Sequence, residues 1–157
     1  VALDLREAAH GRGHSPLAKQ CEARYLLHID GNSYSAGLKY KLACGSLVIR
    51  LTSPFSEFFE PGLIDGVHYI SLQTPNVWTK NVSTIRESFE RDLSPRLTSL
   101  LSEFEGRGTD MSGPSRAARI AVEGQRFALR QLSSHGLDCY WYTVLKHYMK
   151  LYGYGVT

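Results

Sequence analysis

YLLHIDGNSYSAGLKYKLACGSLVIRL, residues Tyr25–Leu51, places a polar loop between two apolar runs. The first run, Tyr25–Ile29, is short and continuous, which is typical of a strand covered on both faces. Helix-forming residues follow over Tyr34–Cys44, and Gly45 stands where a helix end favours a residue tolerant of positive φ. Ser46–Leu51 is rich in β-branched residues and predicts a second strand. A strand, loop, helix and strand within about thirty residues predict a right-handed βαβ unit.

The rest of the chain contains one more apolar run and then the spacing typical of helices. Val67–Leu72, VHYISL, predicts a third strand, and Ser53–Gly62 before it predicts a loop with a short helical turn. Three stripes at helical spacing follow: Leu97, Leu100, Leu101 and Phe104; then Ala117, Ile120, Ala121, Gly124, Phe127 and Ala128; then Trp141, Val144, Leu145, Tyr148 and Met149. Strands that come first and helices that dominate later predict an α/β layered domain with added C-terminal helices.

Local signals predict where the later helices begin. Thr84–Glu87 matches a capping box, and Ser94–Pro95 combines a cap with a proline at the first helical position. Asp138 is expected to cap the last helix. Glu105–Ser115, EGRGTDMSGPS, has the composition of a flexible insertion.

Composition and charge limit the class of protein. The 157 residues suffice for one domain, residues 1–157, and 43% hydrophobic with 21% charged residues is ordinary for a globular protein. No apolar run approaches the roughly 20 residues that a membrane-spanning helix needs. The net charge of +3 comes from scattered basic residues, so we expect no nucleic-acid partner. The chain begins at Val1 without a recognisable signal peptide, and we expect a processed protein or a piece of a longer one.

The polar loop after the first strand contains residues that suit a phosphate. In an open parallel sheet, ligands bind outside the carboxyl ends of the strands, where a helix start offers N–H groups and a partial positive charge. Gly31 lets the main chain approach a ligand, and Ser33, Tyr34 and Ser35 add hydroxyl donors. On spacing alone the pattern favours a plain turn at Asp30–Ser33, because neither G-x-G-x-x-G nor a P-loop is present.

A stronger pointer is an ordered set of motifs. The set consists of DGNSYS and LKYKLACGS between Asp30 and Ser46, SEFF at Ser56–Phe59, VHYISL at Val67–Leu72, EGQRFA at Glu123–Ala128 and CYWYTVL at Cys139–Leu145. From about Cys21 to about Tyr152 the chain resembles the C-terminal half of glycosyltransferase family 90, which includes protein O-glucosyltransferases and fungal capsule-associated xylosyltransferases.

The resemblance implies a fold and an activity. It implies the Rossmann-like donor-binding half of a GT-B enzyme, in which two such domains face a cleft. It further implies an inverting transfer from UDP-glucose or UDP-xylose to a protein or glycan hydroxyl, with no required metal. The catalytic base is then expected in the N-terminal half, outside this chain. The implied location is the secretory pathway, in the ER lumen or Golgi.

Carried onto this sequence, the resemblance implies a set of donor-binding residues. The diphosphate positions are Gly31, Asn32, Ser33, Tyr34 and Ser35, and Glu57 is expected to reach the nucleotide ribose. A solvated carboxylate beside core phenylalanines is an equal alternative for Glu57, and His68 is expected to be hydrogen-bonded rather than a donor contact.

One departure from the family pattern concerns charge. Gly37 stands where the family usually has an arginine, and Lys39, Lys41 or Arg50 would have to supply the positive charge. This departure keeps a second hypothesis open, a non-catalytic endomembrane binding module that retains the fold.

The three cysteines cannot all pair with one another. Similar proteins join the positions of Cys21 and Cys44, and place a bridge to the N-terminal half at that of Cys139. Such bridges require an oxidising compartment, and the sequon at Asn81 weakly favours a glycoprotein. The alternative is three buried free thiols in a cytosolic domain. Tyr140, Trp141 and Tyr142 are expected to pack the last helix.

Overall fold

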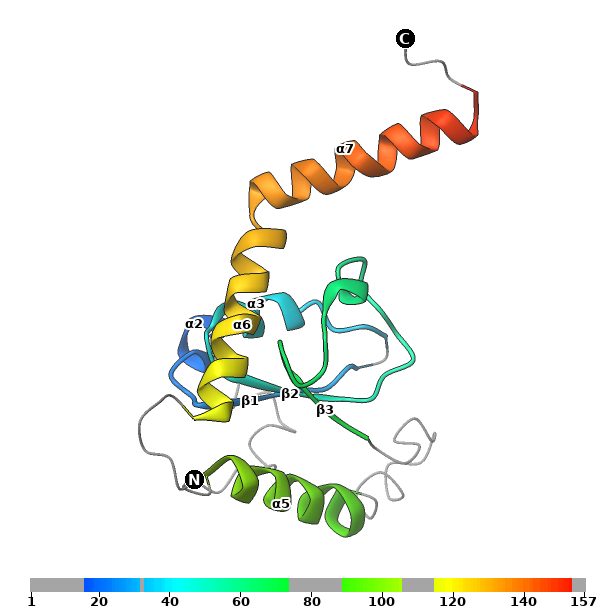
Figure 1. Cartoon of the computed structure of the whole chain (residues 1–157). Coiled ribbons are helices and arrows are strands. Elements are labelled where there is room, and N and C mark those ends of the chain that lie inside the picture. The colour runs from blue at the N-terminus through cyan, green and yellow to red at the C-terminus, as the bar shows by residue number, and fades with distance from the viewer. Residues whose placement is uncertain (1–15, 32, 74–88, 106–114, 154–157) are drawn as a thin grey trace.

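The computed structural model describes residues 16–31, 33–73, 89–105 and 115–153. Its centre is a three-stranded parallel sheet in the order β1-β2-β3, shown in Figure 1. The strands are β1 (Tyr25–His28), β2 (Leu47–Leu51) and β3 (Ile70–Leu72). The helices are α2 (Leu17–Gln20), α3 (Leu38–Ala43), α5 (Ser94–Glu105), α6 (Arg116–Gln131) and α7 (Ser134–Leu151), with a 3₁₀ turn η1 (Glu60–Gly62) and a π-helical turn η2 (Phe89–Leu93).

The predicted βαβ unit is confirmed. Helix α3 connects β1 to β2, which pair in parallel, and Gly45 after the helix has a φ of 70°. A side chain at this left-handed position would be strained, so glycine is favoured there. The α/β class predicted from the strand and helix order is also confirmed, and three parallel strands with helices agree with a Rossmann-like fold.

Helices cover both faces of the sheet. Helices α3 and α6 lie over one face and α5 lies over the other, as Figure 1 shows. On the first face, Val48 of β2 packs with Leu38, Leu42 and Ala128. On the second face, Ile49 and Leu51 of β2 pack with Leu72 of β3 and with Leu97, Leu100 and Leu101 of α5. The alternation of β2 side chains between the two faces follows from the pleat of the strand.

The stripes expected on α5 and α6 face the core, although their members differ in how deeply they are buried. Phe104 of α5 and Ile120 of α6 belong to the same apolar cluster. Gly124 of α6 permits a close approach, because a Cβ added there would clash with the carbonyl oxygen of His68. The two helices therefore pack on the sheet through the residues that their spacing marked.

Four expected element boundaries were wrong. The helix expected from Tyr34 begins at Leu38, because the Ser35 N–H donates to Asp30 Oδ1 and lies outside the helix. Strand β3 begins at Ile70, because the preceding residues form a turn around Gly66, whose φ is 77°. Ser94 does not cap α5, since the helical path already runs through η2. The N-cap of α7 is Ser133, whose hydroxyl accepts the Gly136 N–H at 3.1 Å, so Asp138 lies within the helix.

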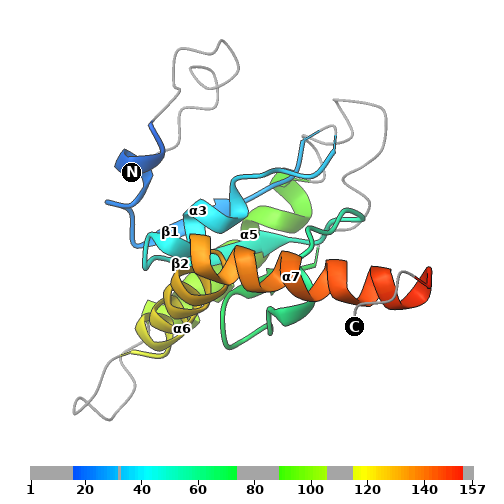
Figure 2. The ribbon, with the colours of Figure 1, turned by 90° about the horizontal axis from the view of Figure 1, so that it is seen from above.

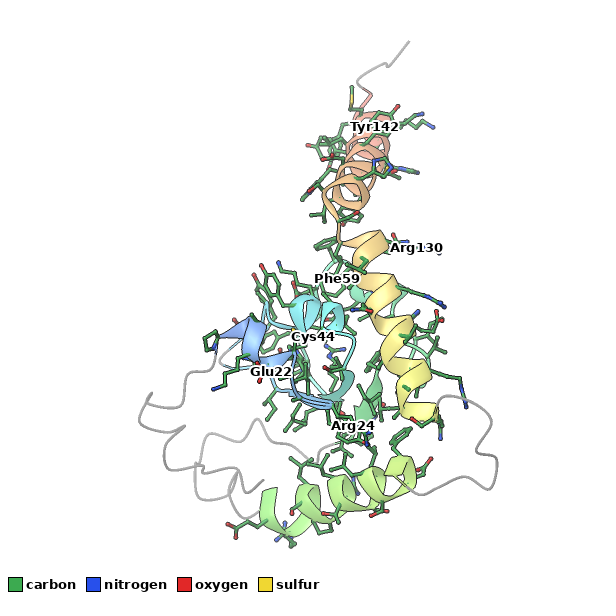
Figure 3. The ribbon with its side chains drawn as sticks, turned by 90° about the vertical axis from the view of Figure 1, so that its left-hand side faces the viewer. Glu22, Arg24, Cys44, Phe59, Arg130 and Tyr142 are labelled. Carbon is green, nitrogen blue, oxygen red and sulfur yellow. A yellow bond between two sulfur atoms is a disulfide. The ribbon has the colours of Figure 1, made fainter. Side chains whose placement is uncertain are left out.

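The expected packing of the last helix was also wrong. Helix α7 has no buried residue and projects away from the body, as Figures 1 and 2 show. Trp141 is 56% exposed and Tyr142 is 67% exposed, and Figure 3 shows Tyr142 on the projecting helix. Tyr140 alone of the three aromatics is half-buried, with its ring 4.7 Å from that of Phe58. No helix in the described ranges is long and apolar enough to cross a membrane.

Some expectations fall outside the described residues. These are the capping box at Thr84–Glu87, the Asn81 sequon and residues 106–114 of the expected insertion. The two ends of that insertion are described: Glu105 is the last residue of α5, and Ser115 is the N-cap that precedes α6.

Candidate functional site

A row of polar side chains crosses the sheet near the carboxyl ends of the strands. His28 of β1 is the register partner of Arg50 of β2, and Arg50 is the partner of Ser71 of β3. We call these three residues the polar row. The preceding pair on the same face, Leu26 and Val48, is apolar and buried. The character of this face therefore changes from apolar to polar at the end of the sheet where parallel folds bind ligands.

Arg50 anchors the loop that follows β2. Its Nη2 lies 2.7 Å from Glu60 Oε2 and donates to the carbonyl oxygen of Phe55 at 3.2 Å. The other oxygen of Glu60 accepts the Glu57 N–H at 3.0 Å. The side chains of Arg50 and Glu60 are only 15% and 10% exposed, so their ion pair is largely shielded from water. Because Glu60 also accepts the Glu57 N–H, the pair holds the Glu57 backbone beside the polar row.

Three buried side-chain polar atoms in the described ranges have no hydrogen-bond partner, and all three lie in this region. They are His28 Nδ1, Arg50 Nε and Glu57 Oε1. Buried polar groups are normally paired, and leaving one unpaired costs about 1–3 kcal/mol. Concentration of such groups at one end of the sheet is typical of a site that completes its hydrogen bonds with a ligand.

Glu57 is the sequence-predicted residue with the clearest sign of a binding role. Burial raises the pKa of its carboxyl, which the positive charge of Lys39 partly opposes. Its Oε1 has no partner. A hydroxyl donor, such as a sugar presents, would supply the missing hydrogen bond.

The predicted phosphate loop is partly tied up by its own groups. The Ser35 N–H donates to Asp30 Oδ1 at 2.7 Å, and the Gly37 N–H points to the Ser35 hydroxyl at 3.4 Å. Gly31, Ser33 and Tyr34 are exposed, and space is open beside Gly31. Asn32 lies outside the described residues. The loop therefore presents side-chain hydroxyls and a bare backbone at Gly31, while at least two of its amides are already engaged.

The three cations considered as substitutes for an arginine at Gly37 differ in their surroundings. Arg50 is held by Glu60. Lys41 is partly buried and donates to the Leu27 carbonyl at 2.7 Å, and its burial lowers its pKa. Lys39 lies over the Tyr40 ring with its Nζ 5.2 Å from the centroid. Of these three cations, Lys39 makes the weakest interaction with other groups of the protein and is therefore the best placed to interact with a ligand.

His68 has a structural role, as expected. Its Nδ1 accepts the Ile64 N–H at 2.9 Å, and its ring lies 5.1 Å from that of Phe127. Burial lowers its pKa, so the ring accepts this hydrogen bond in its neutral form. His68 therefore belongs to the turn before β3 and contributes to packing against α6.

A hollow of about 420 Å³ lies beyond the Glu57 loop. Its lining comes from the loop and η1 and from the α6–α7 junction: Phe58, Phe59, Gly62, Phe127, Gln131 and Tyr140. The volume lies within the range of small-molecule sites, and the lining is mainly aromatic. No cluster of three or more metal-ligating side chains is found in the described ranges.

A disulfide joins Cys21 to Cys44, with the two Cα atoms 4.8 Å apart, as the resemblance implied. Figure 3 labels Cys44 at the end of α3. Cys139 on α7 is exposed and is not in a disulfide. The disulfide fastens the βαβ unit near the amino ends of β1 and β2, away from the polar row.

Comparison with known proteins decides the family. The sequence pattern that defines glycosyl transferase family 90 matches residues 3–90, which is more than half of the chain. The chain belongs to glycosyl transferase family 90. The matched region contains β1, α3, β2 and β3, and hence the polar row and the Glu57 loop.

Curated relatives extend this family membership along most of the chain. Protein O-glucosyltransferase 1 of Bos taurus is 30% identical over 141 residues, which cover 90% of this chain and 30% of the relative. The human protein of the same name matches equally well. O-glucosyltransferase rumi of Drosophila melanogaster is 29% identical over 137 residues, or 87% of this chain and 28% of the relative. This chain thus spans about 30% of the length of the relatives that it matches.

Sequence reasoning missed His28, Asp30 and Glu60 as members of the site. The sequence did contain a signal for His28, because His28 and Arg50 are polar residues in otherwise apolar strands. They lie at the carboxyl ends of those strands and on the same face of the sheet. No such signal marked Glu60, since its pairing with Arg50 depends on how the loop folds back.

Proposed function

We propose that this family 90 chain is the donor-binding part of a UDP-sugar-dependent glycosyltransferase. The observation that carries the proposal is the group of three unpartnered polar atoms at the carboxyl ends of parallel strands, two in the polar row and one on Glu57 of the following loop. A nucleotide-sugar offers anionic oxygens and hydroxyls, which can complete the hydrogen bonding of Arg50 Nε and Glu57 Oε1. The names of the relatives favour glucose over xylose as the sugar.

The proposed donor contacts are divided between two loops. The diphosphate would lie against the exposed backbone of Gly31 and the hydroxyls of Ser33, Tyr34 and Ser35, with Lys39 neutralising charge. Asn32 belongs to the same proposed set. Glu57 would accept hydroxyl hydrogens of the ribose through Oε1.

The proposed reaction is an inverting transfer of the sugar to a protein or glycan hydroxyl. The acceptor oxygen attacks the anomeric carbon from the face opposite UDP, the bond to the diphosphate breaks, and UDP leaves with the bonding electrons. Lys39 and the loop hydroxyls would stabilise the negative charge that develops on the leaving group. We assign no catalytic base within this chain. A base in another part of the full-length polypeptide would take the proton of the acceptor hydroxyl.

The exposed surface of α7 fits a place within a larger enzyme. The relatives are about three times as long as the matched segment, and α7 presents large apolar side chains to solvent. We propose that another part of the polypeptide covers this helix and that Cys139 bridges to it. The Cys21–Cys44 disulfide favours an oxidising compartment, such as the ER lumen or the Golgi.

A second candidate function is a non-catalytic binding module of the secretory pathway. Gly37 in the loop and the internal bond between the Ser35 amide and Asp30 favour it, because both reduce the positive potential offered to a diphosphate. This module would retain the fold and bind UDP weakly or not at all.

Calorimetric titration of the intact protein with UDP separates the two candidates. The transferase proposal predicts saturable binding that uridine, lacking phosphates, reproduces only weakly. It also predicts UDP release from UDP-glucose when an acceptor is supplied. Absence of saturable UDP binding by the intact, folded protein would contradict the transferase proposal and favour the second candidate.

A further inference from the structure

The side chain of Asp30 accepts a hydrogen bond from the backbone of the loop between β1 and α3. The Asp30 side chain is only 3% exposed, and its Oδ1 accepts the Ser35 N–H at 2.7 Å. This hydrogen bond joins Asp30, which follows β1, to Ser35, which lies three residues before the start of α3. The Ser35 amide therefore faces the buried Asp30 carboxylate, while Ser33 and Tyr34 are exposed.

His28 faces the same carboxylate oxygen. Its Nε2 lies 3.4 Å from Asp30 Oδ1, and the histidine is 2% exposed. A carboxylate only accepts hydrogen bonds, so the neutral imidazole must carry its proton on Nε2 to interact with Asp30. That tautomer leaves Nδ1 as an acceptor, which agrees with its having no partner in the described structure.

The charges around His28 indicate that it contributes a hydrogen and not a charge. Burial and the nearby Lys41 and Arg50 lower its pKa to about 4, although Asp30 opposes this shift. Lys41, held in place by its bond to the Leu27 carbonyl, supplies the positive charge facing Asp30. At neutral pH the histidine therefore orients the carboxylate, while the lysine balances its charge.

We propose that His28 and Asp30 are positioning residues that set the conformation of Ser33–Ser35 for binding of the donor diphosphate. His28 orients Asp30, Asp30 holds the Ser35 amide, and the loop then presents its hydroxyls outward. Neither residue touches the ligand in this arrangement. The inference rests on the proposed function for the identity of the ligand, but the loop ordering itself is independent of it.

The test compares His28→Leu with His28→Gln in the intact protein. Leucine removes the donor, and glutamine restores an N–H donor at about the distance of Nε2. UDP affinity should fall about tenfold in His28→Leu, as expected for loss of a hydrogen bond to a charged group, and recover to within about threefold in His28→Gln. His68→Leu is the matched control, because it also removes a hydrogen-bonded, partly buried histidine, and it should leave UDP affinity unchanged.

A second readout needs no ligand. Hydrogen exchange of the peptide that contains Ser35 should be faster in His28→Leu than in the parent protein and near the parent rate in His28→Gln. Failure of the parent protein to bind UDP would contradict the proposed function, and the exchange rates would still decide the positioning role. Unchanged affinity and unchanged exchange in folded His28→Leu would overturn the inference. Should His28→Leu not fold, Asp30→Ala takes its place, because alanine removes the oxygen that both His28 Nε2 and the Ser35 N–H face. Faster Ser35 exchange is expected, and parent-like exchange would contradict the proposal.

Discussion

Two neighbouring rows on one face of the sheet have opposite characters. The apolar row, Leu26 and Val48, is covered by α3 and α6, and its members need only volume and burial. The polar row lies two residues further along the strands, and there His28 and Arg50 each keep a buried atom without a partner. The apolar row stabilises the domain through burial alone. The polar row leaves buried hydrogen-bonding atoms without partners in a folded protein. Incomplete pairing at one end of a well-packed sheet is the physical mark of a binding site.

The largest expected effect is a loss of stability when a side chain packed against the apolar row is shortened. Leu42 of α3 packs with Val48 and is 1% exposed. Leu42→Ala should lower the free energy of unfolding by about 3 kcal/mol, since it removes buried methyl groups and leaves a cavity. Chemical denaturation measures the loss, and UDP affinity of the folded protein should not change. Leu129→Ala on α6 is the control, because that leucine is 62% exposed and should cost much less stability. Equal losses in the two variants would show that burial in the described core does not set the size of the effect.

The polar row should instead make stability depend on pH. The pKa of His28 is lowered from 6.5 to about 4 by burial and by Lys41, so the unfolded chain binds the proton first as the pH falls. The free energy of unfolding should therefore drop between about pH 6.5 and pH 4, by up to about 3 kcal/mol from this residue. His28→Gln should flatten this part of the profile. An identical pH slope in parent and variant would show that His28 titrates normally.

An arginine at Gly37 tests how close the loop lies to a diphosphate. The φ of Gly37 is −75°, and a Cβ there would lie 3.4 Å from the Ser35 hydroxyl, so the backbone accepts a side chain. Gly37→Arg should strengthen UDP binding about tenfold through a charge-assisted contact. Gly37→Gln, which adds a long side chain that carries no charge, should strengthen UDP binding much less. Equal affinities for both variants and the parent would place the diphosphate elsewhere.

The smallest expected effect concerns Lys39. Lys39→Met should weaken UDP binding about three- to fivefold, because a charge that remains partly exposed to water contributes about 1 kcal/mol, and the difference should shrink at high salt. Lys146→Met is a matched control, since Lys146 of α7 also lies over a tyrosine ring, at 5.7 Å. Equal losses in the two variants would indicate a general effect of net charge.

Much of the fold could be predicted from local pattern. The β1–α3–β2 unit, Gly45 and the buried faces of α5 and α6 follow from apolar spacing and from the conformational freedom of glycine. Helix α7 could not be predicted in this way. Its stripe around Trp141 has the same spacing as that of α6, but spacing shows only that a helix has an apolar face, and not what covers it.

The candidate site lies where the sequence predicts one, but several of its contacts could not be predicted. The end of β1 was expected to bind a ligand, and the polar row lies there. The inward bond of the Ser35 amide was not foreseen, because an Asp that begins a loop can accept an amide within that loop or leave it to a ligand. The pairing of Arg50 with Glu60 depends on the path of a loop, which carries no periodic signal.

Hydrogen exchange of the intact protein with and without UDP tests the central claim most directly, because it locates the ligand along the chain. The account predicts slower exchange in peptides that cover residues 28–38 and 50–60, with no change in α7. Unchanged exchange in both of these segments at saturating UDP, with slower exchange elsewhere, would contradict the assignment of the polar row as the donor site.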